Sequence, residues 1–201
     1  APPLEVPDGS FDLVYAISVF THLPDSWAEW LVELHRVLAP DGLLLVTFIG
    51  EGAIAWVTDD AWVEERIGMH VISYGQGWEL GGAMVVHSPW WIRAHFQRAF
   101  EIVEVRPTGF GSVPGHGHGT VLMRRRAQTC TAEALRMPEP NEPREAIALE
   151  HNRRRLFAEI AALRTQQEQL ARELDDAHER VQHTEAVRRI ADRWRRIRRL
   201  R

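Results

Sequence analysis

The stretch that most constrains the fold of this chain runs from residue 11 to residue 48. It opens with an almost continuous apolar and β-branched run at 11–17 and closes with a second apolar run at 43–49. Continuous apolar strands are typical of parallel sheets covered on both faces. Five apolar residues between the two runs recur at helical spacing: Trp27, Trp30, Leu31, Leu34 and Leu38. The stretch therefore predicts a strand, a helical crossover and a parallel strand within an α/β sheet.

Short polar signals mark the ends of the predicted helix. Ser26, followed three residues later by Glu29, has the pattern of a capping box. In this motif each of the two side chains accepts a hydrogen bond from the backbone N–H of the other residue. The sequence Ala-Pro-Asp-Gly at 39–42 ends the helix, and Gly42 is free to take a positive φ in this turn.

Further elements of the sheet follow downstream. Residues 83–87 have the composition of a strand, and Ser88-Pro89 begins a helix because Ser can cap it and Pro suits its first position. Alternating apolar residues at 100–106 and the run at 120–123 lie on either side of a Gly-rich turn. These two segments predict an antiparallel hairpin that ends the sheet.

The composition changes twice after this hairpin. Residues 127–145 contain three prolines among polar residues and predict a linker between a domain at 1–126 and a helix at 146–201. The helix segment contains no Pro or Gly, and its apolar or small residues recur at alternating three- and four-residue spacing. This heptad pattern favours a coiled coil. A single helix cannot bury such a seam by itself, so we expect self-association through 146–201.

Charge is distributed unevenly along the chain. Residues 1–150 hold ten Arg against twenty acidic residues, whereas residues 151–201 hold fourteen Arg against eight. The end of the chain, Arg188–Arg201, holds eight Arg and one Asp. Such a basic amphipathic helix can lie on an anionic membrane surface or bind a phosphate-rich ligand. A charged coiled-coil surface is the alternative, and we expect no sequence-specific nucleic-acid binding.

Cysteine usage and hydropathy bear on location. Cys130 is the only cysteine, which excludes an intramolecular disulfide and thiolate-rich metal clusters. No apolar run approaches the ~20 residues of a membrane span, and no signal-peptide pattern opens the chain. These features predict a cytoplasmic location, with a peripheral position at the inner membrane face as an alternative.

Three segments together resemble class I S-adenosylmethionine-dependent methyltransferases: DGSFDLV at 8–14, SVFTHL at 18–23 and HRVLAPDG at 35–42. By this resemblance, residues 4–126 correspond to the fourth strand, the following helix, the fifth strand and the C-terminal hairpin of that family's Rossmann-like sheet. Asp41 departs from the pattern, because the family usually carries a second Gly there. The resemblance implies methyl transfer from S-adenosylmethionine to an unknown small-molecule or sugar acceptor.

The resemblance also implies an absence. The family's first strand, its glycine-rich cofactor loop and the acidic residue that holds the ribose hydroxyls would lie upstream of residue 1. The glycine-rich segments at 109–111 and 115–119 lie at the wrong end and do not connect a strand to a helix. We therefore expect the downstream part of a methyltransferase domain, with an open apolar edge on its first strand, that by itself binds cofactor poorly and is inactive. The alternative function is a non-catalytic oligomerisation or scaffold protein with a remnant methyltransferase fold.

Candidate site residues lie where the first strand ends, because ligands of open α/β sheets bind beyond the carboxyl ends of the strands. The resemblance implies that backbone groups of three residues approach the methionine end of the cofactor: Ala16, Ile17 and Ser18. His22 follows on the same loop. It can act as a general base toward an acceptor hydroxyl, line the substrate pocket or serve a structural role.

Three further residues are candidates for the wall of a substrate pocket: Phe20, Thr21 and His118. His116 and His118 have a spacing that could ligate a metal, but the neighbouring sequence offers no third ligand, so no metal site is predicted. Five tryptophans between residues 56 and 91 can either line an acceptor pocket or pack in the core.

Overall fold

The computed structural model of the protein describes residues 2–59 and 61–198, without the side chains of residues 182–187 and 191–198. The chain divides into two compact units, Ala1–Asn152 and Arg153–Arg201. The elements of the first unit begin with β1 (Phe11–Ala16), η1 (Phe20–His22), α1 (Trp27–Val37), β2 (Leu38–Phe48), η2 (Ile54–Trp56) and η3 (Glu64–Arg66). They continue with β3 (Met69–Ile72), η4 (Trp78–Leu80), β4 (Met84–His87), α2 (Pro89–Phe96), β5 (Phe100–Phe110), β6 (His118–Arg125) and α3 (Ala132–Arg136).

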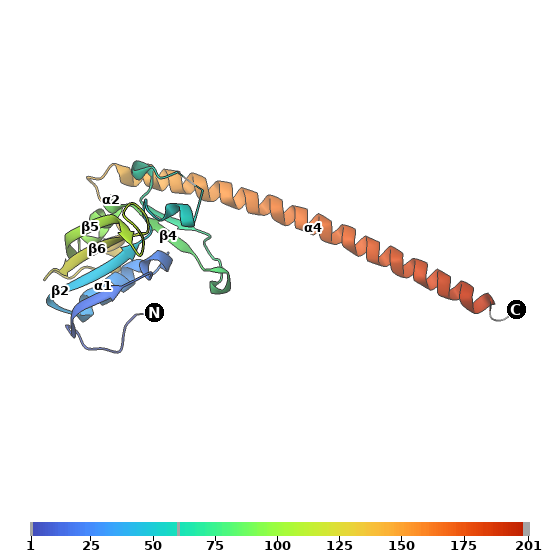
Figure 1. Cartoon of the computed structure of the whole chain (residues 1–201), viewed down its shortest axis with the longest axis horizontal. Coiled ribbons are helices and arrows are strands. Elements are labelled where there is room, and N and C mark those ends of the chain that lie inside the picture. The colour runs from blue at the N-terminus through green and yellow to red at the C-terminus, as the bar shows by residue number, and fades with distance from the viewer. Residues whose placement is uncertain (1, 60, 199–201) are drawn as a thin grey trace. The chain divides into compact units, whose positions relative to one another are not determined.

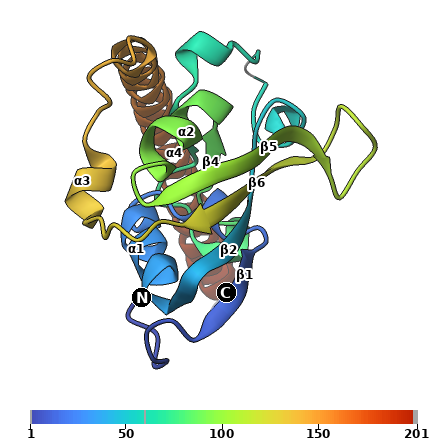
Figure 2. The same cartoon turned by 90° about the vertical axis from the view of Figure 1, so that its left-hand side faces the viewer.

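The β1–α1–β2 segment has the predicted topology. Strands β1 and β2 are parallel, with a register that runs from Leu13 opposite Leu43 to Ala16 opposite Val46. Strand β6 pairs antiparallel with β2, and β5 pairs antiparallel with β6, so the sheet order is β1-β2-β6-β5 (Figure 2). This arrangement confirms the α/β fold and the antiparallel hairpin that ends the sheet.

The strand predicted at 83–87 forms as β4, but outside the main sheet. It pairs antiparallel with β3 in a separate two-stranded sheet. A single parallel bridge between Ile49 and Val86 links this small sheet to the end of β2. Helix α2 then begins as predicted, because the Ser88 hydroxyl accepts a hydrogen bond from the Trp91 N–H at 3.3 Å.

Helices cover one face of the main sheet. Figure 2 shows α1, α2 and α3 on the same side of it, and their apolar side chains form one core with β2 and β6. The opposite face of β1 is open, since Leu13 is 56% and Tyr15 69% exposed. The prediction that the strand at 11–17 is covered on both faces is therefore wrong, because no described part of the chain covers this second face. As expected, β1 is an edge strand with exposed apolar side chains, and β2 is its partner.

Two local predictions at the ends of α1 are wrong in detail. The Ser26 side chain makes no capping hydrogen bond, and the carboxylate of Glu29 is paired with the Arg136 guanidinium instead. At the other end, Asp41 takes the positive φ of 62° rather than Gly42. Glycine is needed at 42 for a different reason: a Cβ there would lie 2.9 Å from the Ala39 carbonyl oxygen.

The segment predicted as a linker contains α3, which the sequence analysis did not identify. The Thr131 hydroxyl caps this helix by accepting from the Ala134 N–H at 3.1 Å, and Leu135 is fully buried. The long helix α4 (Arg144–Arg198) follows and is continuous through its described length (Figure 1). Its first residues belong to the first compact unit and the rest form the second.

Candidate functional site

The carboxyl end of β1 is held in place by β2. The backbone leaves the strand through Ser18, which adopts a left-handed φ of 54°. The Ser18 N–H donates to the Oγ1 of Thr47, 2.8 Å away, and Thr47 is fully buried on β2. A non-glycine residue rarely adopts this φ, so the bond to Thr47 fixes an unusual bend. Ala16 is buried at this point, whereas Ile17 and Ser18 are exposed beyond the strand end.

The loop after this bend turns two candidate pocket residues into the interior. Phe20 and Thr21 in η1 are each 1% exposed. The Phe20 ring packs against Phe96 of α2, with the ring centroids 5.7 Å apart. The Thr21 hydroxyl has no hydrogen-bond partner among the described residues. The side chains of both residues are thus buried under the backbone of their own loop. Their role as walls of a substrate pocket stays a prediction.

His22 is oriented by the segment before β4. Its Nδ1 lies 2.9 Å from the Ala83 carbonyl oxygen. Because a carbonyl can only accept, this contact assigns the proton of the neutral ring to Nδ1 and the lone pair to Nε2. The Trp78 ring lies beside the imidazole at a centroid separation of 5.2 Å and is itself 72% exposed. His22 is therefore a positioned group that can accept a proton at Nε2.

The topology of the sheet brings His118 to the same place. It begins β6, and because β6 runs antiparallel to β2, its start lies at the carboxyl end of β2, where Gly119 pairs with Phe48. Burial lowers the pKa of His118, and the charge of neighbouring His22 lowers it further. The Trp56 ring lies 5.6 Å from His118. The two candidate histidines, far apart in sequence, are thus neighbours.

Four of the five tryptophans separate into a buried and an exposed pair, a division that the sequence left open, and Trp62 is partly buried beside a small second apolar cluster. Trp90 and Trp91 of α2 are buried in the core. Trp56 and Trp78 are 60% and 72% exposed beside His118 and His22. The exposed pair gives this end of the sheet flat apolar surfaces next to two imidazoles.

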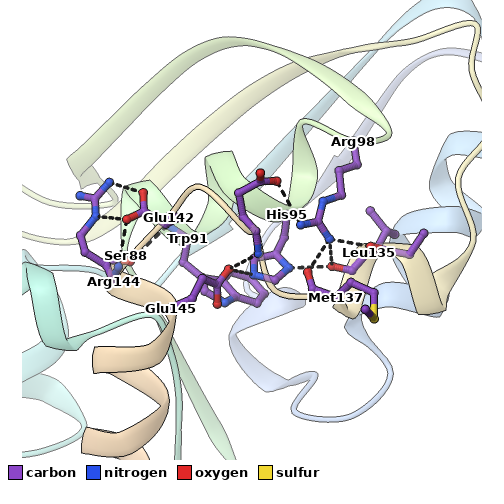
Figure 3. Close-up of polar contacts among 11 residues, drawn as sticks. Ser88, Trp91, His95, Arg98, Leu135, Met137, Glu142, Arg144 and Glu145 are labelled. Carbon is purple, nitrogen blue, oxygen red and sulfur yellow. Dashed lines mark hydrogen bonds and ion pairs between the residues drawn. The ribbon is translucent and has the colours of Figure 1, made fainter.

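A hollow that the sequence did not indicate lies between α1, α2, α3 and the start of α4. It has a volume of about 570 Å³ and includes Trp27, Trp91 and His95 in its lining. Figure 3 shows His95 between the Leu135 carbonyl oxygen, 2.6 Å from Nδ1, and the Glu145 carboxylate, 2.8 Å from Nε2. Burial lowers the pKa of His95, while these two acceptors oppose the shift.

Arg98 makes a structural contact next to His95. Its guanidinium donates to the carbonyl oxygens of Ala134 and Met137, each at 2.5 Å, and forms an ion pair with Glu139. Figure 3 shows this guanidinium beside Leu135 and Met137. These carbonyls lie at the end of α3, where backbone acceptors lack helical partners. The polar groups around His95 therefore tie α3 to α2.

Neither a metal site nor a membrane span is found in the described part of the chain. No three or more His, Cys, Asp or Glu side chains gather there as metal ligands, and His116 is exposed. No helix among the same residues combines the length and apolar content needed to cross a bilayer. Most side chains of the basic end, Arg188–Arg201, lie outside the described residues, so its predicted membrane or phosphate contacts are not addressed.

A comparison with protein families finds a match at the N-terminal segment of the chain. Residues 1–46, which include β1, α1 and most of β2, match the model of the family described as "Methyltransferase domain". Over these 46 residues the chain is similar to that family. The match includes the loop that carries Ser18 and His22. No curated protein sequence matches the chain.

Several solved structures are similar to the chain at low sequence identity. A methyltransferase from Methanosarcina mazei is 18% identical with a TM-score of 0.41, and the match covers 63% of this chain and 64% of that one. One from Mesorhizobium loti is 17% identical with a TM-score of 0.42, and the match covers 61% and 65%.

The 1,6-didemethyltoxoflavin-N1-methyltransferase of Burkholderia thailandensis, solved with S-adenosylhomocysteine, is 14% identical with a TM-score of 0.42. Its match covers 59% of this chain and 45% of that one. The chain thus spans less than two thirds of the length of each of these three proteins.

Proposed function

We propose that the first unit is part of an S-adenosylmethionine-dependent methyltransferase domain and that its acceptor is a small molecule or sugar. The observation that carries this proposal is the family match over β1, α1 and most of β2. At the carboxyl ends of these two strands lie the groups described above: the Ser18 bend, His22 and His118. Ligands of open α/β sheets bind at this end.

The residues at the end of β1 suit one part of the cofactor. Ile17 and Ser18 are exposed, and the bond from Ser18 to Thr47 holds their backbone in a fixed bend. Together with Ala16 they offer backbone polar groups and a hydroxyl, which fit the amino-acid end of S-adenosylmethionine. They carry no carboxylate for the ribose hydroxyls. We propose that a glycine-rich loop and an acidic residue from a segment outside this sequence complete the site.

His22 and the nearby aromatic rings form the proposed acceptor side. When bound, S-adenosylmethionine supplies an electrophilic methyl group. The Ala83 carbonyl keeps the Nε2 lone pair of His22 available, so this atom can take the proton from an acceptor hydroxyl. Trp56, Trp78 and His118 would orient the acceptor by packing against its apolar surface. Phe20 and Thr21 would support this wall from below.

Cofactor titrations of the isotope-labelled 201-residue chain test this proposal. In NMR spectra, millimolar S-adenosylhomocysteine is expected to shift the backbone amides of Ala16, Ile17 and Ser18. Adenosine lacks the amino-acid end and is expected to leave these amides unchanged. Calorimetry with S-adenosylmethionine is expected to show no micromolar binding, because the ribose and adenine contacts are not supplied.

Each titration can contradict a different part of the proposal. If S-adenosylhomocysteine leaves the three amides unchanged, they do not bind the cofactor. Micromolar affinity in calorimetry would support a cofactor site but contradict the need for a further segment.

Self-association is a second element of the proposed function, because α4 carries exposed apolar residues through its described length. The alternative is a scaffold protein in which the methyltransferase fold is retained without catalysis. The same NMR titration separates the two, since a scaffold has no reason to keep cofactor contacts at Ser18. A cytoplasmic location, with Arg188–Arg201 at an anionic membrane surface, is also part of the proposal.

A further inference from the structure

The second unit presents a regular apolar seam on α4. Eight positions from 156 to 181 alternate at four- and three-residue spacing, which is the a and d pattern of a heptad repeat. The d positions are Leu156, Leu163, Leu170 and Ala177, and the a positions are Ile160, Gln167, Leu174 and Val181. At 1.5 Å per residue the seam is about 39 Å long.

The apolar side chains of this seam lie open to solvent in the single chain. Five of them are between 45% and 60% exposed: Ile160, Leu163, Leu170, Leu174 and Val181. A row of exposed leucines at heptad spacing on one helix face is typical of a helix that pairs with another helix of matching pattern. The chain itself supplies such a helix in a second copy.

The identities of the seam residues favour a particular assembly. Leucine occupies three of the four d positions, and β-branched residues occupy a at Ile160 and Val181. Leucine at d with β-branched residues at a favours parallel two-stranded coiled coils. Leucine side chains pack well in the d layers of such a dimer, and β-branched side chains pack well in its a layers.

Gln167 decides between the two orientations. In a parallel pair in register, each a residue faces the same residue of the other copy, so the two Gln167 amides can hydrogen-bond to each other. In the antiparallel pair with the greatest overlap, a residues face d residues, and Gln167 would face Leu170. The buried amide would then lack a partner, which is unfavourable.

The flanking charges are compatible with the parallel register. In that register a g residue faces the e residue five positions later on the other copy. Glu159 then faces Arg164, which is an attractive pair of opposite charges, and Glu173 faces His178. The intervening pair, Gln166 with Ala171, is uncharged. Glu159 also lies 3.3 Å from Arg155 on its own helix, so Arg164 would share this carboxylate.

We propose that residues 156–181 pair with the same residues of a second copy as a parallel, in-register, two-stranded coiled coil with Gln167 facing Gln167. This inference rests on the self-association proposed above and adds its stoichiometry, orientation and register. A dimer of this kind would place two methyltransferase units on the same end of the paired helices.

Disulfide trapping in the full chain tests the orientation. In a Cys130→Ser background, Ile160→Cys is expected to form a covalent dimer under mild oxidation, because a residues of a parallel pair lie within disulfide reach and Gln167 is kept. The matched control is Thr165→Cys, on the opposite face of the helix, which is expected to stay monomeric on a non-reducing gel. A mixture of Ile160→Cys and Ala177→Cys chains that forms mainly the mixed disulfide would overturn the parallel register, because these two residues face each other in the antiparallel pair.

Sedimentation measurements test the stoichiometry separately. The unmodified chain, of 23.1 kDa, is expected to sediment with twice its monomer mass. Leu163→Glu is expected to dissociate the dimer, whereas Thr165→Glu is expected to leave it intact. A trimer or tetramer mass would overturn the two-stranded assignment, and a monomer would overturn self-association altogether. Neither outcome bears on cofactor binding, which the NMR titration measures independently.

Discussion

At the scale of single residues, we expect a buried histidine to make the stability of this protein sensitive to acid. His87 at the end of β4 is fully buried, and neither ring nitrogen has a hydrogen-bond partner among the described residues. Burial, and secondarily the charge of His95, lowers the pKa of His87 from 6.5 to about 3. The folded state therefore holds this ring neutral, while the unfolded chain can protonate it.

We expect the free energy of unfolding to fall as the pH is lowered from about 6.5 toward 3, because protons bind the unfolded His87 first. One such group contributes up to about 1.4 kcal/mol per pH unit in this range. His87→Leu should reduce the slope of the unfolding free energy against pH by the amount expected for one proton, about 1.4 kcal/mol per pH unit. Urea unfolding followed by tryptophan fluorescence at several pH values measures it. The control is His116→Leu at an exposed position, and an unchanged slope in His87→Leu would contradict the assignment.

The sequence shows which polar residues have a local capping pattern. It does not show which side chains form hydrogen bonds or ion pairs in the folded protein. Ser26 and Glu29 have the spacing of a capping box, yet Glu29 binds Arg136 from α3. Arg36 lies in the HRVL segment that suggested the family. Its guanidinium holds the N-terminal segment through the Val6 carbonyl at 2.9 Å and the Asp8 carboxylate at 2.5 Å. These contacts join residues from distant parts of the sequence, so local patterns carry no signal for them.

At the scale of elements, the register between β2 and β6 depends on one glycine. Gly119 pairs with Phe48, and a Cβ at this position would overlap with the Phe48 ring, which is 1% exposed. The buried ring has little room to move. The absence of a side chain at 119 is therefore needed for these strands to pair at the end that carries His118.

We expect Gly119→Ala to destabilise the first unit by about 1–3 kcal/mol, the cost of forcing extra volume into a packed core. Thr120→Ala, the next position on β6, should cost less than about 1 kcal/mol. Combining Gly119→Ala with Phe48→Leu should cost less than the sum of the single changes, because the smaller side chain removes the overlap. Chemical denaturation measures all three, and strict additivity would contradict the clash.

The elements themselves were largely predictable, because their signals are periodic and local. The parallel β1–β2 pair, the Ser88-Pro89 start of α2, the β5–β6 hairpin and the long α4 all formed as expected. Helix α3 was missed, because five helical residues among prolines give too short a pattern. Its stability comes from the buried Leu135 and from the Arg98 contacts at its end.

At the scale of the whole molecule, the chain consists of two units of different character. The apolar core lies within residues 1–152, and Ala148 is the last residue of α4 that contributes to it. Beyond Asn152, described apolar residues of the helix such as Leu163 and Leu170 are exposed. The unit that carries the candidate site should therefore fold without the rest of α4.

We expect a chain ending at Asn152 to keep the NMR amide pattern and the thermal unfolding midpoint of the first unit, because all of the core residues are retained. The same truncation should abolish dimerisation. A collapsed or poorly dispersed spectrum would show that the first unit depends on residues 153–201. The matched control is the full chain with Leu163→Glu, which removes the proposed pairing but keeps the helix.

The sequence by itself determined the α/β class, the neighbouring parallel strands, the closing hairpin and the heptad seam, because each is encoded in short-range periodicity. It also indicated the methyltransferase family through residues 8–42, and the match to residues 1–46 agrees. Only the tertiary structure decided that His22 and His118 are neighbours, since this depends on the antiparallel direction of β6 against β2. It also decided which face of β1 stays open, because helix placement on a sheet is a property of the packed core.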